Sequence, residues 1–133
     1  MGTSGYSTNP IPAGSNSYEV WLNALWYGTF NFIYDVRFWR STDFSPNTGL
    51  SVMAKTNGQT SYLQPTNATS SVAIAGVSSS DPGTANVSIS GSLSTSLTSS
   101  GRSDYIVLQL QTTTNAPAGD TSLATFSLSY VES

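Results

Sequence analysis

The chain has 133 residues, a formal net charge of −3 and only 8% charged residues. It contains 25 Ser and 17 Thr but neither Cys nor His. This composition excludes disulfide frameworks, Cys/His zinc sites, thiol nucleophiles and His general bases. The length predicts one compact domain. Solubility must come from hydroxyl and amide groups rather than from ions, a composition that is common in proteins outside cells.

The start of the chain is rich in Pro, Gly, Ser, Thr and Asn and has no periodicity. We expect residues 1–16 to be a linker, the end of a shaft or an expression remnant, and residues 17–133 to form the single domain. The start of the chain lacks the basic and apolar regions of a signal peptide. The sequence contains no run of 18 apolar residues, so we expect no membrane-spanning segment.

From Ser17 onward, apolar and polar side chains alternate with the period of a β-strand. The pattern covers residues 18–25 and 30–39, and Gly28 lies between them. We therefore expect a long hairpin over these two segments. One face of its second strand would be strongly aromatic, formed by Phe30, Phe32, Tyr34, Val36 and Phe38.

Short strands separated by turn residues follow along the rest of the chain. The loop 41–49 precedes an expected strand over 50–54, and Asn57-Gly58 predicts a hairpin in which 61–63 returns beside that strand. A total of seven to nine short strands predicts an all-β fold, an antiparallel β-sandwich. The remaining strands are expected at 72–77, 87–91, 105–111 and 123–131.

The carboxylates do not predict a catalytic pair. Glu19 and Asp35 lie at polar positions of expected strands, and the others lie in turns or at the C-terminus. A retaining glycosidase needs two carboxyl groups about 5 Å apart, and a Ser nucleophile needs a base that this chain lacks. We therefore predict that the protein is not an enzyme and binds no cofactor or metal. Two glycosylation sequons, at Asn67 and Asn86, are expected by chance in a chain of this composition.

The basic residues are too few and too scattered for a phosphate-binding surface, so nucleic acid is not an expected partner. Trp21, Trp26 and Trp39 suit either a sugar-stacking platform or a subunit interface. Because a two-layer sandwich cannot bury apolar residues on both faces of the first hairpin, we interpret the surplus as an oligomer interface. The four basic residues are Arg37, Arg40, Lys55 and Arg102.

Both ends of the domain resemble a known family. The segment 124–133, ATFSLSYVES, resembles the last strand of adenovirus fibre heads (knobs), which is rich in aromatic residues and Ser. The segment 17–41, SYEVWLNALWYGTFNFIYDVRFWRS, is similar to the opening strands of those heads. The compact heads of non-mammalian adenoviruses match this chain length best, and reovirus attachment-protein heads have a similar architecture. The resemblance does not extend over residues 45–103.

The resemblance implies a homotrimeric β-sandwich without catalytic residues that binds a protein or a sialylated glycan on a host cell. We therefore expect a viral attachment module at the tip of a fibre, on the virion surface. The alternative is an extracellular filament or surface-layer subunit with an immunoglobulin-like sandwich, whose N-terminal segment adds as a strand to a neighbour. A third hypothesis, an enzyme or carbohydrate-binding module, requires paired acids or exposed stacked aromatic rings.

No binding residue of the fibre-head family maps onto this sequence by motif. Because loops usually carry receptor contacts, we expect such contacts at Asp43 in the loop 41–49, at Asn57 in its turn, and at Arg102 and Asp104. Arg102 is the only basic residue of the C-terminal half and is therefore the candidate partner of a sialic acid carboxylate.

Overall fold

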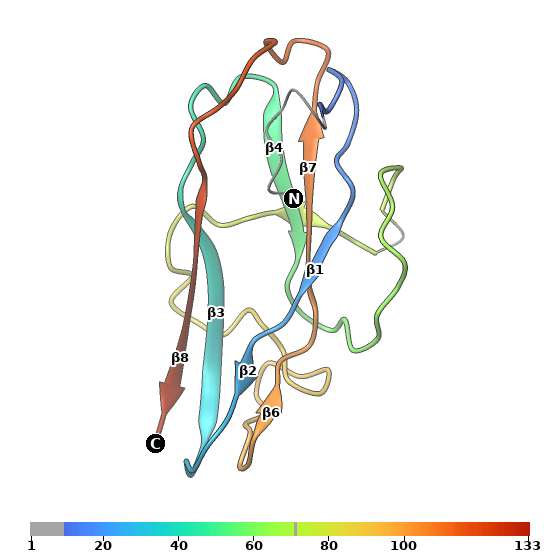
Figure 1. Cartoon of the computed structure of the whole chain (residues 1–133). Coiled ribbons are helices and arrows are strands. Elements are labelled where there is room, and N and C mark those ends of the chain that lie inside the picture. Colours follow the sequence, from blue (N-terminus) through green and yellow to red (C-terminus); the bar gives the residue numbers. More distant parts are fainter. Residues whose placement is uncertain (1–9, 71) are drawn as a thin grey trace.

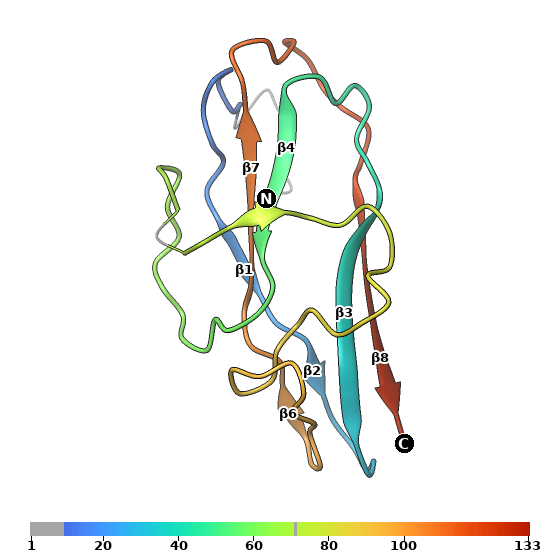
Figure 2. The same ribbon diagram turned by 180° about the vertical axis from the view of Figure 1, so that it is seen from behind.

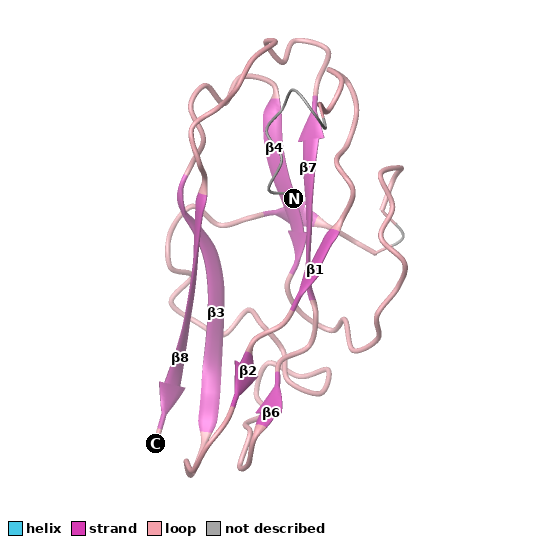
Figure 3. Ribbon diagram, in the orientation of Figure 1, coloured by secondary structure: helices cyan, strands magenta, loops and turns pink. Residues whose placement is uncertain are grey.

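A computed structural model describes residues 10–70 and 72–133 of the chain. These residues contain eight strands and no helix (Figures 1 and 3), which confirms the all-β prediction. All strand pairings are antiparallel. The strands are β1 (Val20–Leu22), β2 (Leu25–Trp26), β3 (Ile33–Thr42), β4 (Leu50–Lys55), β5 (Ala75–Gly76), β6 (Gly101–Arg102), β7 (Ile106–Thr112) and β8 (Thr125–Glu132).

The strands form the two layers of a sandwich, as the sequence predicts. One layer is the sheet β1-β7-β4-β5 and the other is the pair β3-β8, which lie side by side in Figures 1 and 2. The short pair β2-β6 lies at the end where β8 finishes. Burial of each large apolar side chain between the layers stabilises the fold by about 1.5–3 kcal/mol. The buried cluster contains Trp26, Ile33, Val36, Phe38, Val52, Ala54, Val87, Ile89, Ile106 and Leu108.

A bulge in β3 changes which residues face the core. Tyr34 pairs with Val131 while Arg37 pairs with Ser129, so β3 carries one extra residue at this point. Asp35 lies there with a φ of 52°. The side chains of Ile33 and Val36 are therefore both buried, and Phe32 and Tyr34 are exposed. The predicted aromatic face is therefore only partly correct: Val36 and Phe38 are buried, but Phe32 and Tyr34 are not, because a strict two-residue alternation does not continue through the bulge.

The predicted hairpin over 18–25 and 30–39 is also wrong. The first segment divides into β1, which pairs with β7, and β2, which pairs with β6. Strand β3 pairs with β8 from the other end of the chain. Alternation identifies a strand but does not identify its partner, and here the partners are remote in sequence.

The predicted hairpin at Asn57-Gly58 is wrong as well, since residues 61–63 form no strand. The partners of β4 are β7 and the two-residue β5, which is all that forms of the strand expected over 72–77. Gly58 does occupy a turn, with a φ of 71°, but its backbone N–H donates to the hydroxyl of Ser88 rather than closing a hairpin. Strands β4, β7 and β8 lie where the sequence predicts strands.

The segment after β4 covers the outer face of the larger sheet. Gln109 of β7 points to this side and is 1% exposed, and its Nε2 lies 3.1–3.3 Å from the backbone oxygens of Ser17, Thr66 and Ala68. The carboxylate of Glu19 is also buried, where it accepts hydrogen bonds from the Trp21 indole, the Thr66 backbone N–H and Ser70. These polar side chains hold an irregular segment where a further strand would otherwise lie.

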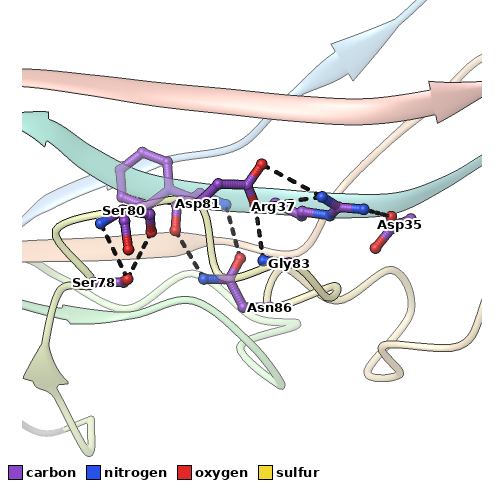
Figure 4. Close-up of polar contacts among 8 residues, drawn as sticks. Asp35, Arg37, Ser78, Ser80, Asp81, Gly83 and Asn86 are labelled. Atoms are coloured by element: carbon purple, nitrogen blue, oxygen red, sulfur yellow. Dashed lines mark hydrogen bonds and ion pairs between the residues drawn. The ribbon is translucent and has the colours of Figure 1, made fainter.

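The loop 78–86 covers the edge of β3 that faces away from β8 (Figure 4). The Arg40 backbone N–H donates to the Ser78 carbonyl. The side-chain amide of Asn86 takes the place of a strand: its Oδ1 accepts from the Phe38 N–H at 2.7 Å and its Nδ2 donates to the Phe38 carbonyl at 2.8 Å. The backbone of β3 is thereby satisfied on both edges.

An ion pair fastens the same loop. The guanidinium of Arg37 lies between the carboxylates of Asp35 and Asp81, the latter at 3.3 Å (Figure 4). The hydrogen bond from Arg37 lowers the pKa of the Asp35 carboxyl, and these carboxylates raise the pKa of Arg37. The ion pair therefore joins the bulge of β3 to the loop that covers the edge of this strand.

We predict that Asn86→Ala destabilises the fold by about 1–3 kcal/mol, because it leaves both backbone groups of Phe38 without these partners. Urea denaturation followed by circular dichroism measures the change. The matched control is Asn67→Ala, since Asn67 is exposed in a loop. Equal stability of the two variants would contradict the role given to Asn86.

The lowered pKa of Asp35 predicts a dependence on pH. The folded protein favours the ionised form of Asp35. The contribution of this carboxylate to stability is therefore complete above the ordinary Asp pKa of about 3.9, and it is lost as the pH falls through the lower pKa of Asp35 in the folded protein. Asp35→Asn should therefore reduce stability at pH 7 and have progressively less effect below about pH 4. Urea midpoints across this range test the prediction. In an Arg37→Gln background the same substitution should no longer alter the acid dependence, and an unchanged effect there would exclude Arg37 as the cause.

Candidate functional site

One long strand edge of the sandwich lacks a partner in the described part of the chain. Strand β8 has eight residues and pairs with β3 on one side only, and it forms the outer margin of its layer in Figure 1. The other edges are covered or short: the loop 78–86 covers β3, the Thr66 carbonyl accepts from the Glu19 N–H beside β1, and β5 has two residues. The edge of β8 therefore presents backbone donors and acceptors to the surroundings.

The apolar side chains of β8 that face inward are only partly covered. Phe126 stacks on Phe38 with ring centroids 5.6 Å apart, and Tyr130 meets the Trp26 ring edge-on at 5.5 Å. Leu128 lies between them and remains 38% exposed, and Tyr130 is 44% exposed. The core of the sandwich thus continues to the surface along this strand.

A cavity of about 300 Å³ lies between the two layers near the start of β8. Its lining is mainly apolar, and Asp120 is the charged residue among the lining residues. Leu123, which borders it, is 89% exposed. Together with the edge of β8, this cavity forms what we call the open side. The main apolar residues that line it are Val20, Phe44, Val52, Leu108, Leu110 and Phe126.

The open side has the properties of a surface that binds an extended segment. Its strand edge offers hydrogen bonds to a backbone, and its partly covered apolar residues offer contacts to alternate side chains. Among the residues that line the cavity or form β8, only Asp120 and Glu132 are charged, so recognition here depends mainly on shape and burial.

The expected contact residues do not form one site. Asp43 lies in the loop after β3, where its carboxylate accepts from the Phe44 N–H and pairs with Arg40 at 3.2 Å. Arg102 is exposed on β6, at the opposite end of the molecule (Figure 1). Asn57 is exposed in its turn. The loop contacts expected from the sequence are therefore dispersed over the surface.

Asp104 is buried and stabilises a turn rather than lying on the surface. It is 8% exposed, and its Oδ2 accepts hydrogen bonds from the Ser88 hydroxyl at 2.5 Å and the Gly91 N–H at 2.7 Å. The neighbouring Ser103 is also buried. The carboxylate of Asp104 is occupied in holding the turn at 88–91, which corrects the expectation of an exposed contact at this corner.

The tryptophans are not a flat platform. Trp26 is buried, and Trp21 meets Tyr62 and Tyr105 edge-on at 5.4 and 5.8 Å. Trp21 and Trp26 therefore pack on other residues of the chain, and the half-buried Trp39 lies on β3 in the other layer, so the three rings do not lie together.

The sequence predicts a strand at the position of β8 but does not indicate that the edge of this strand is a binding surface. The available signal was its composition, because the strand contains neither Lys nor Pro, the residues that commonly protect an exposed edge. The outer side could not be recognised without knowing that β3 is the partner of β8.

No family model, curated protein or solved structure matches this chain. Within residues 10–70 and 72–133, no helix is long and apolar enough to cross a membrane.

Proposed function

We propose that this chain is a non-enzymatic assembly subunit: a β-sandwich that joins other copies of itself along its open side, in a structure outside the cell. The observation that carries the proposal is the unpaired edge of β8, flanked by the partly exposed Leu128 and Tyr130. A long apolar edge of this kind promotes association unless it is protected. The hydroxyl-rich surface with few charges supports the extracellular placement.

Two arrangements of copies fit the proposal. The resemblance to fibre heads favours a closed homotrimer, and the alternative is a filament in which the N-terminal segment of one copy adds to the next. Residues 1–9 lie outside the described residues, so their addition to a neighbour stays a prediction. Residues nearer the domain already pair with it: Asn16 bridges to Gln111, and Ser15 exchanges hydrogen bonds with Thr112.

We predict that the full chain associates at micromolar concentration. Light scattering coupled to size exclusion should give a multiple of the 14.0 kDa mass of one chain, twice that mass for a pair and three times for a trimer. Open-ended polymers that disappear when residues 1–9 are deleted would favour the filament arrangement. A monomer at every concentration up to the millimolar range would contradict the proposed function.

A second candidate function, attachment to a host receptor, is favoured by the end of the molecule where β2 and β6 pair. Arg102 lies directly opposite Leu25 there, and the nearby Tyr27 is 78% exposed. An exposed guanidinium beside exposed apolar groups suits an acidic glycan, because Arg binds a carboxylate through paired hydrogen bonds and a Tyr ring packs on a sugar. We propose this end as the receptor-facing surface of a fibre head on a virion.

The second candidate function predicts that the protein binds sialylated glycans on an array and that Arg102→Ala weakens that binding by roughly tenfold or more. The matched control is Lys55→Ala, which removes the same charge elsewhere and should bind like the original chain. Loss of binding in both variants would indicate a general charge effect. The acidic-glycan site would be excluded if Arg102→Ala bound glycans as strongly as the unmodified chain does, or if the unmodified chain bound no glycan.

A further inference from the structure

The residues along β8 read almost identically in both directions. Around Leu128 as the centre, Ser127 matches Ser129 and Phe126 matches Tyr130, within the segment TFSLSYV. Antiparallel strands run in opposite directions, so two copies of such a segment can pair with like residues opposite one another. This symmetry is what a twofold interface between identical chains requires.

We propose that two copies of this chain pair antiparallel through their β8 edges, with Leu128 opposite Leu128. The inference rests on the proposed function and names the surface through which the copies join; because a twofold contact joins two copies, it predicts a pair in place of a closed homotrimer. In this register Phe126 of one copy lies opposite Tyr130 of the second copy, and Ser127 lies opposite Ser129. Residues directly opposite one another share a face of the sheet, so the apolar side chains meet on the core side and the hydroxyls on the other.

The charges of the segment permit this pairing. Residues 121–131 contain no charged side chain, and Glu132 is the only charged residue of β8. In the proposed register Glu132 lies opposite Ala124 of the second copy, so no two like charges are opposed. The neutrality of the edge therefore favours a second copy over an acidic or basic partner.

The geometry of β8 is also suitable for pairing. Both irregularities of the β3-β8 register place the extra residue in β3, so β8 itself runs without a bulge. Two copies would form a continuous sheet in the order β3-β8-β8-β3. Leu128 and Tyr130, which are 38% and 44% exposed in one chain, would then be covered by Leu128 and Phe126 of the second copy.

Single cysteines test the register, because the chain has no Cys of its own. Opposed residues in antiparallel strands have Cα atoms about 4.5–5.5 Å apart, within the range that a disulfide spans. Leu128→Cys should form a disulfide-linked dimer under mild oxidation. Ser127→Cys and Ser129→Cys should cross-link to each other when mixed, and more efficiently than either does alone. Tyr62→Cys, at an exposed aromatic residue that contacts Trp21 of the other layer, measures random collision.

A charge on the edge tests the energetics. Leu128→Lys should weaken association at least about tenfold, because pairing would bury two ammonium groups against one another. Leu93→Lys is the matched control, since Leu93 is similarly exposed but lies outside β8. Circular dichroism and urea midpoints verify that both variants fold.

The outcomes distinguish a failure of β8 pairing from a failure of self-assembly as a whole. Cross-linking at Leu128→Cys well above the Tyr62→Cys level, together with dissociation by Leu128→Lys only, supports β8 pairing. Assembly that persists in Leu128→Lys, with no cross-linking above the control, would overturn β8 pairing while leaving self-assembly intact. A wild-type chain that is monomeric throughout would overturn both.

Discussion

The backbone of a β-strand needs hydrogen-bonding partners along both edges, and the rest of this structure depends on how that requirement is met. Strand β7 lies between β1 and β4, and β3 lies between β8 and the loop 78–86. Both strands contribute the most deeply buried residues, among them Ile33 and Ile106. Strand β8 meets the requirement on one side only, and among the described strands that have one neighbour and no covering loop it is the longest.

Polar side chains replace backbone partners in several places, and this explains the composition. The amide of Asn86 pairs with both backbone groups of Phe38 as a neighbouring strand would. Gln109, Glu19 and Asp104 each hold an irregular segment against a sheet or a turn. Hydrogen bonds offset the cost of burying such polar groups, and each of these three side chains makes two or three of them. A chain rich in amides and hydroxyls and poor in ions can therefore maintain a sandwich with few regular strands.

The sequence predicted the strand class and the positions of β4, β7 and β8, because two-residue alternation and turn residues are local properties. Strand partners are not local: β1 and β7 lie near opposite ends of the chain, and nothing in either segment specifies the other. The bulge at Asp35 was also beyond prediction, since the ion pair beside it involves Asp81, which lies in a loop remote in sequence. Asp104 appeared to be an ordinary turn residue, and its burial depends on Ser88 and Gly91 from another part of the chain.

The unequal widths of the two layers explain why the open side exists. A two-strand layer faces a four-strand sheet, and the loop 78–86 extends the narrow layer on the side of β3 only. On the other side, the inward residues Leu128 and Tyr130 are left partly uncovered. A monomeric sandwich commonly protects such an edge with a Lys, a Pro or a bulge, but β8 has no Lys or Pro and runs straight. The same chain covers the edge of β3 with a dedicated loop, so the bare edge of β8 is better explained as a contact surface than as an uncorrected defect.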